Sequence, residues 1–127
     1  MEKRTEKLSR ILNELNIDGL FITDLYNLRY FTGFTGTTGV ALATKNGNFF
    51  FSDFRYKTQA AREVTEMGFE FVEVSRGSLQ TVGEYIKKFG LKNVGFEDVN
   101  VSFSLYQTIK DTFKVELVPV GNKLVME

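Results

Sequence analysis

Four carboxylates occupy positions where they could carry out chemistry. Asp24, Asp53 and the neighbouring pair Glu97 and Asp98 each follow a predicted strand, so they are expected to meet at one end of a sheet. Clustered acids of this kind hold Mg²⁺ and an attacking water in two-metal nucleases. The structural alternative is that Asp24 and Asp53 are turn and helix-capping residues, and that Glu97 and Asp98 are solvated. Sixteen basic residues balance sixteen acidic ones, and no basic stripe lies near these acids, which weakens the nuclease alternative.

A glycine- and threonine-rich segment is the second candidate. Residues Tyr30 to Gly39 contain three glycines and four threonines between aromatic residues. A phosphate-binding loop needs its glycines between a strand and a helix, with Lys and Ser or Thr opening that helix. This segment instead precedes a predicted strand, and the next lysine is Lys45. The pattern favours a loop at an interface, or a lid, over a phosphate site.

Two arginines stand beside aromatic residues, Arg29 before Tyr30 and Arg55 before Tyr56. A guanidinium can bind a carboxylate by donating two parallel hydrogen bonds to it. For Arg55 we favour a structural role, pairing with Asp53 or Asp24. For Arg29, next to the Gly/Thr segment, a local ion pair and a contact with a ligand or partner are both open.

The chain contains no histidine and no cysteine. Histidine general bases, Ser-His or Cys-His nucleophile pairs and the usual zinc sites are therefore excluded within these 127 residues. The lack of cysteine suits a reducing compartment, the N-terminus does not resemble a signal peptide, and no apolar run approaches the roughly 20 residues that span a bilayer. We expect a cytoplasmic protein without membrane or nucleic-acid partners.

The elements that would position these residues alternate along the chain. Residues 4–15 have the apolar spacing of an amphipathic helix, and residues 20–23 that of a buried strand. Residues 24–31 are expected to be irregular or a single turn. Two apolar runs, 40–44 and 48–52, flank a Lys-Asn-Gly turn and predict a hairpin, because Asn and Gly both tolerate positive φ. Asp53 is expected to cap a helix that ends near Met67.

The second half continues the alternation. We predict strands over 69–74, 93–96 and 115–120, with helices over 78–89 and from Ser104, which has a capping-box spacing with Gln107. The strand at 69–74 is expected near an edge, and Pro119 suits a strand end or an edge. The fold class that follows is α/β, a mixed, partly parallel sheet with helices on both faces.

With these residues in view, the chain resembles the N-terminal domain of the creatinase/prolidase group, the Xaa-Pro dipeptidases and aminopeptidases P. The resemblance rests on Asp18 to Ile22, Asn27 to Gly36, the hairpin, and Asp53 to Ala60. It implies a ribonuclease H-like α/β domain at residues 1–121, with residues 122–127 as the start of a linker to a catalytic pita-bread domain that these residues do not include.

The same resemblance implies a function. It suggests that this domain is itself non-catalytic and belongs to a homodimeric metallopeptidase that cleaves the bond before proline, using two divalent metals, Mn²⁺ or Co²⁺, in the catalytic domain. The loop at 29–38 would reach the partner subunit's pocket, with Arg29, Tyr30 and Phe34 as contacts for proline-containing peptide or partner. Asp53, Arg55 and Tyr56 would be structural. A stand-alone binding module remains an alternative, and dipeptidase, aminopeptidase P and creatinase-like activities are not separated.

Overall fold

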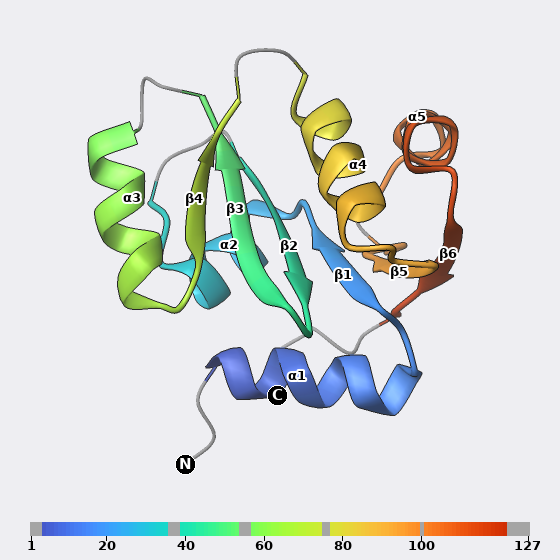
Figure 1. The fold of residues 1–127 in the computed structure, drawn as a ribbon, viewed down its shortest axis with the longest axis horizontal. Coiled ribbons are helices and arrows are strands. Elements are labelled where there is room, and N and C mark those ends of the chain that lie inside the picture. The colour runs from blue at the N-terminus through green and yellow to red at the C-terminus, as the bar shows by residue number, and fades with distance from the viewer. Residues whose placement is uncertain (1–3, 36–38, 54–56, 75–76, 100, 122–127) are drawn as a thin grey trace.

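The fold is built on one six-stranded sheet. The computed structural model describes residues 4–35, 39–53, 57–74, 77–99 and 101–121. Its sheet has the order β4-β3-β2-β1-β5-β6 (Figure 1). The strands are β1 (Gly19–Ile22), β2 (Val40–Thr44), β3 (Gly47–Ser52), β4 (Glu70–Glu73), β5 (Asn93–Phe96) and β6 (Glu116–Pro119).

Strand directions confirm the predicted mixed sheet. β1 pairs with β2, and β2 with β3, in antiparallel fashion, whereas β1 with β5, β5 with β6, and β3 with β4 are parallel. β4 and β6 lie at the two edges, as expected for the strand that carries Glu70 and Glu73 and for the one that ends at Pro119. A proline at an edge costs no ladder hydrogen bond.

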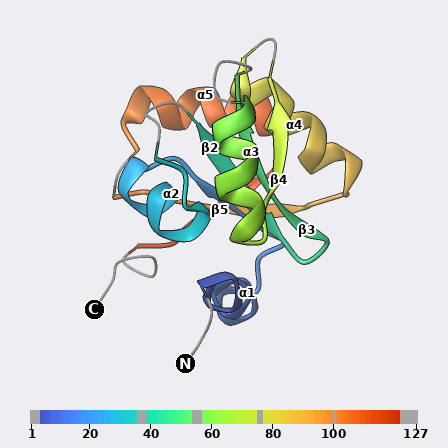
Figure 2. The same ribbon diagram turned by 90° about the vertical axis from the view of Figure 1, so that its left-hand side faces the viewer.

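Helices cover both faces of the sheet. They are α1 (Arg4–Leu15), α2 (Leu25–Thr32), α3 (Lys57–Glu66), α4 (Ser78–Lys88) and α5 (Phe103–Phe113). Figure 2 shows α2 and α4 on opposite sides of the strands. None of the described helices is long and apolar enough to cross a membrane.

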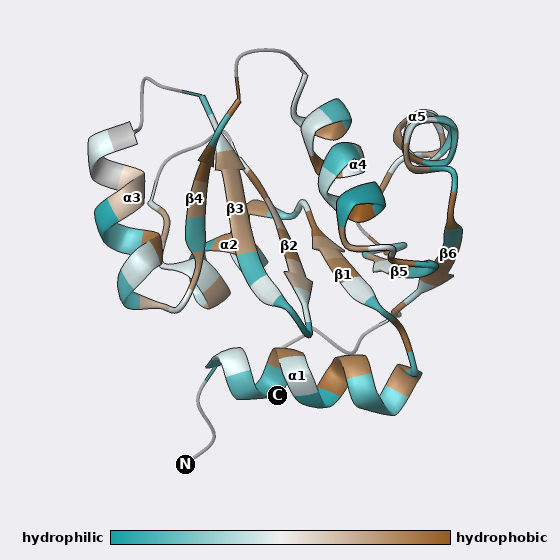
Figure 3. Cartoon of the chain, in the orientation of Figure 1, coloured by the Kyte–Doolittle hydropathy of each residue, from teal (hydrophilic) through white to brown (hydrophobic). Residues whose placement is uncertain are grey.

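Two apolar layers result, one on each face, because successive strand residues point to opposite sides. Figure 3 shows the apolar colour concentrated on the central strands, while outward helix turns are hydrophilic. The layer under α1, α2 and α3 contains Leu8, Ile11, Leu12, Leu20, Ile22, Leu28, Phe31, Phe34, Phe50, Ala60 and Val64. The layer under α4 and α5 contains Phe21, Leu42, Phe49, Phe51, Val82, Ile86, Val94, Ile109 and Phe113.

The expectation of an irregular or single-turn segment at 24–31 is wrong. Residues 25–32 form helix α2, which Asp24 caps by accepting a hydrogen bond from the Asn27 N–H at 3.1 Å. Gly33 ends it in the left-handed region, with φ of 78°. The helix has eight residues, too few for a periodic pattern to stand out. Its stability comes from the cap and from buried Leu28 and Phe31, as is usual for short helices.

Two turn assignments also differ in detail. Thr44 pairs with Gly47, so Lys45 and Asn46 alone form the hairpin loop. Gly47 has a positive φ of 149°, but Asn46 does not. The cap of α5 is Ser102 rather than Ser104, because its hydroxyl accepts from the Leu105 N–H at 3.1 Å.

The predicted cap of α3 stays a prediction. The described part of α3 begins at Lys57, four positions after Asp53. Arg55 and Tyr56, to which we gave structural roles, lie outside the described residues, as do residues 122–127.

Candidate functional site

Glu97 is the buried centre of the region that follows β1 and β5. It comes directly after β5 and is 1% exposed, so the expectation that it is solvated is wrong. One carboxylate oxygen accepts hydrogen bonds from the backbone N–H groups of Thr23 and Asp24 and from the Thr23 hydroxyl. The other accepts from the side-chain amide of Asn27 at 2.6 Å. A buried carboxylate is tolerated when its lone pairs are used in this way.

Two further acids of the predicted cluster, Asp24 and Asp98, also have structural partners. Asp24 caps α2, and Asp98 accepts a hydrogen bond from the Gly121 N–H at 2.7 Å. The structure does bring Asp24 and Glu97 together, but through the backbone N–H of Asp24. Within the described ranges, no three His, Cys, Asp or Glu side chains are grouped so that they could hold a metal ion. These carboxylates therefore do not fit a two-metal site.

The network around Glu97 sets the position of α2, whose outer face is apolar and basic. Leu25 and Tyr26 are 46% and 75% exposed, and Arg29 is exposed beside them. Together with Arg4 and Tyr30 they line an open hollow of about 640 Å³. Sequence reasoning missed Leu25 and Tyr26. Once residues 25–32 are recognised as a helix, the spacing of Tyr26 and Arg29 places them on the side away from the buried Leu28 and Phe31, and Leu25 flanks them in its first turn.

Tyr30 is held in place by the first helix. The Arg4 guanidinium lies 4.4 Å from the centre of the Tyr30 ring and donates a hydrogen bond to the Tyr30 carbonyl at 2.8 Å. The Tyr30 ring meets Phe31 edge to face at 4.8 Å. A stacked arginine contributes about 0.5–1 kcal/mol at an exposed site, so α1 fixes one wall of the hollow.

Arg29 is available for an external contact. Its backbone carbonyl accepts from the Gly33 N–H at 3.0 Å. Its side chain is exposed and has no hydrogen bond or ion pair with any residue that the structure describes. A guanidinium in this state can form a bidentate contact with a carboxylate from a ligand or partner.

Phe34 belongs to the core. It is 1% exposed and packs on Phe50, with ring centres 4.6 Å apart. This placement removes Phe34 from the set of residues whose side chains can contact another molecule. Residues 36–38 of the Gly/Thr segment lie outside the described residues, whereas Gly39 is described and lies against the Phe50 ring.

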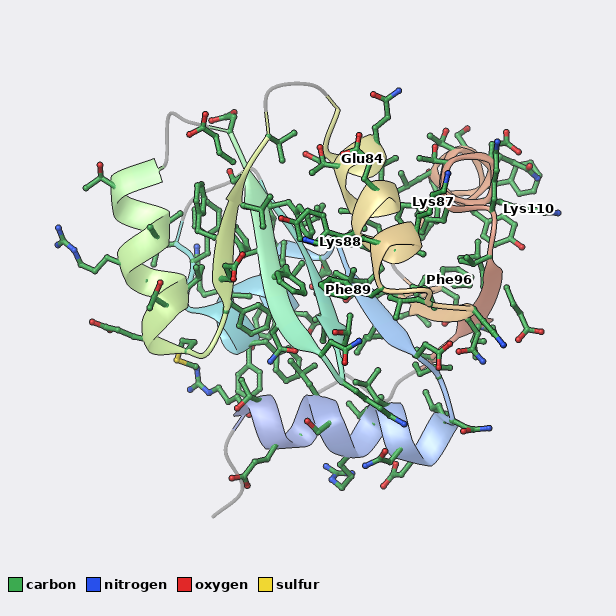
Figure 4. All side chains as sticks on the ribbon, in the orientation of Figure 1. Glu84, Lys87, Lys88, Phe89, Phe96 and Lys110 are labelled. Atoms are coloured by element: carbon green, nitrogen blue, oxygen red, sulfur yellow. The ribbon has the colours of Figure 1, made fainter. Side chains whose placement is uncertain are left out.

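A second hollow of about 870 Å³ lies between α4 and α5. Its charged side chains are Glu84, Lys87, Asp111 and Lys114, and Figure 4 labels Glu84 and Lys87 on α4. Two acids and two bases give no net field that would select one class of ligand. The face of α2 is therefore the stronger candidate.

Comparisons with known proteins point to one family. A family model described as the creatinase/prolidase N-terminal domain matches residues 4–126. The chain is 37% identical over 122 residues to "Uncharacterized peptidase YqhT" of Bacillus subtilis (strain 168). The match covers 95% of this chain and 34% of that protein.

Solved structures agree with this relationship. An Xaa-Pro dipeptidase from Bacillus anthracis superposes with a TM-score of 0.89 at 31% identity, over 95% of this chain and 34% of that one. An aminopeptidase P structure from Streptococcus thermophilus gives a TM-score of 0.87 at 30% identity, covering 95% and 92%. The chain thus spans about a third of the length of YqhT and of the Bacillus anthracis dipeptidase.

Proposed function

Because the chain belongs to the creatinase/prolidase N-terminal domain family, we propose that it is the non-catalytic front domain of an Xaa-Pro peptidase. The whole protein would hydrolyse the peptide bond before proline in a dipeptide or at a peptide N-terminus. Support comes from relatives whose names identify an Xaa-Pro dipeptidase and an aminopeptidase P. The division proposed is a domain at 1–121 and a linker from 122.

The chemistry of the side chains supports a non-catalytic role. The chain has no histidine, and Asp24, Glu97 and Asp98 already accept hydrogen bonds within the fold. A metallopeptidase needs free carboxylate or imidazole ligands that leave an open coordination position for water. The divalent metals, Mn²⁺ or Co²⁺, would accordingly be held by a catalytic domain that follows this one.

The face of α2 would shape access to that active site. Arg29 and Tyr30 open the segment at 29–38 that we expect to reach the pocket of the other subunit in a homodimer. Arg29 would hold a carboxylate, either the C-terminus of a short substrate or an acid of the partner. The single observation that carries this role is the exposed Arg29 guanidinium beside the open hollow.

The test uses the full-length protein with Mn²⁺ and an Xaa-Pro dipeptide. Replacing Arg29→Ala removes a charge-assisted contact and should raise KM by about tenfold or more, while Arg29→Lys should recover part of the loss. Arg10→Ala is the matched control, because Arg10 is exposed on α1 and pairs with Glu14 on the same helix at 3.2 Å.

Two results would contradict the proposal at different points. Unchanged KM and unchanged peptide-length preference in Arg29→Ala would remove Arg29 from substrate selection. Turnover of the dipeptide by residues 1–127 alone would show that this domain is itself catalytic.

A further inference from the structure

Four exposed apolar side chains lie in two pairs, one on each of two segments of the chain. Among the described residues, the large hydrophobic side chains that are exposed are Leu25, Tyr26, Val99 and Phe103, the last two at 56% and 76%. Leu25 and Tyr26 open α2 after β1, and Val99 and Phe103 follow β5 and open α5. Exposed apolar side chains that adjoin one another, rather than scattering singly, mark an interaction surface.

The two segments leave the sheet at the same end of its strands. β1 and β5 are parallel neighbours, with Phe21 opposite Phe96, so the residues after each strand emerge side by side. The hydrogen bonds from Thr23, Asp24 and Asn27 to Glu97 join the segments directly. Figure 2 shows α2, the start of α5 and the end of β6 on one side of the molecule.

The described part of the chain also finishes at this end of the strands. The Val120 N–H donates to the Phe96 carbonyl at 3.1 Å, and the Gly121 N–H donates to the Asp98 carboxylate at 2.7 Å. Asp98 directly precedes Val99. Any polypeptide that continues after Gly121 therefore starts beside the exposed apolar residues.

Resting on the function proposed above, we infer that Leu25, Tyr26, Val99 and Phe103 form a docking surface for the catalytic domain of the same chain. A domain tethered a few residues from a surface is present at an effective concentration on the order of millimolar. It therefore competes well against a second molecule for that surface. The aromatic side chains Tyr26 and Phe103 are of the type that anchors such contacts.

The inference is tested by cysteine labelling of the full-length protein. Leu25→Cys and Phe103→Cys place a thiol on the proposed surface, and Lys45→Cys places one on the exposed hairpin loop as the control. Each variant is treated with a maleimide reagent, and the modified peptide is quantified by mass spectrometry. We expect residues 25 and 103 to react about tenfold or more slowly than residue 45, because a docked domain covers them.

Dilution distinguishes cover of this surface by the catalytic domain of the same chain from cover by a second copy of the protein. Protection that is unchanged on dilution through the dimer dissociation range supports docking within one chain, whereas protection lost on dilution assigns the surface to a second copy and overturns the inference. Equal labelling of all three positions also overturns it.

Peptidase activity, measured on the same preparations, keeps the two proposals apart. A full-length protein that cleaves Xaa-Pro peptides yet labels freely at 25 and 103 refutes docking alone. Protection of both positions in a protein without Xaa-Pro activity refutes the proposed function and leaves the docking surface intact.

Discussion

The Glu97 carboxylate accepts a hydrogen bond from the Asn27 side chain at 2.6 Å, joining residues 70 positions apart in sequence. Both side chains are buried. With the bonds from Thr23 and Asp24, this contact fastens the start of α2 to the end of β5. The candidate face of α2 is therefore positioned by a polar network inside the fold.

Replacing Glu97→Gln should destabilise the domain by about 1–3 kcal/mol, because an amide nitrogen would then face the Asn27 or backbone donors and leave a buried donor unpaired. Urea unfolding of residues 1–127 measures the loss. Glu14→Gln is the matched control, since Glu14 is exposed and pairs with Arg10 on the same helix, and it should cost less than about 0.5 kcal/mol. Equal midpoints for the two variants would show that the network contributes little.

Phe34→Ala should cost about 3–5 kcal/mol, the range for removing a buried phenylalanine ring, because Phe34 packs on Phe50 in the core. Tyr26→Ala removes an exposed aromatic ring from α2 and should change the unfolding free energy by about 0.5 kcal/mol or less in the same fragment. The comparison uses urea midpoints. Similar midpoints for the two variants would mean that Phe34 is not a core residue.

Gly39→Ala should also be destabilising. A Cβ at this position would overlap the Phe50 ring, with the Cε1 atom at 2.9 Å, and overpacking of this kind costs about 1–3 kcal/mol. Phe50→Leu removes the ring edge and should relieve part of that cost. A double-mutant cycle measures the relief as a coupling free energy, and strictly additive losses would rule out the steric explanation.

Ionisation of Tyr85 should make the free energy of unfolding of the domain depend on pH. Burial, together with the carboxylates of Glu70 and Glu84, raises the pKa of Tyr85 above its ordinary value of 10.0; Figure 4 shows Glu84 on the same helix. A raised pKa in the folded state means that the unfolded chain loses the proton first as pH rises. The contribution of protonated Tyr85 to the free energy of unfolding is therefore complete below about pH 10, and it is lost as pH climbs through the folded-state pKa.

The measurement compares wild type with Tyr85→Phe, which cannot ionise but keeps a ring to pack against Phe49 and Phe51. Unfolding free energies are determined at about pH 9 and about pH 11. Wild type should lose more stability than the variant between these values. A difference between the two proteins that does not change with pH would contradict the assigned shift.

Local patterns predicted most of the architecture. The helix at Arg4–Leu15 and the strand at Asn93–Phe96 have the bounds expected from their apolar spacing, because such spacing reports directly which side of an element is buried. The hairpin was predicted from the Asn-Gly turn between two apolar runs. The edge position of β4 was predicted from its alternating apolar and acidic residues, and the mixed sheet from the alternation of helices and strands. Helix α2 was missed because it has only eight residues, and two buried apolar positions, Leu28 and Phe31, are too few to show a helical period.

The amino-acid sequence by itself determined the order of helices and strands apart from α2, the family, and the absence of imidazole and thiolate ligands. Tertiary structure alone decided the roles of Glu97 and Phe34, because burial depends on neighbours contributed by distant segments. Glu97 accepts hydrogen bonds from Thr23, Asp24 and Asn27, some 70 residues away in sequence. Phe34 packs against Phe50 of β3 in the same apolar layer. Local spacing contains no information about such partners, so a solvated acid and a buried one look alike until the chain is folded.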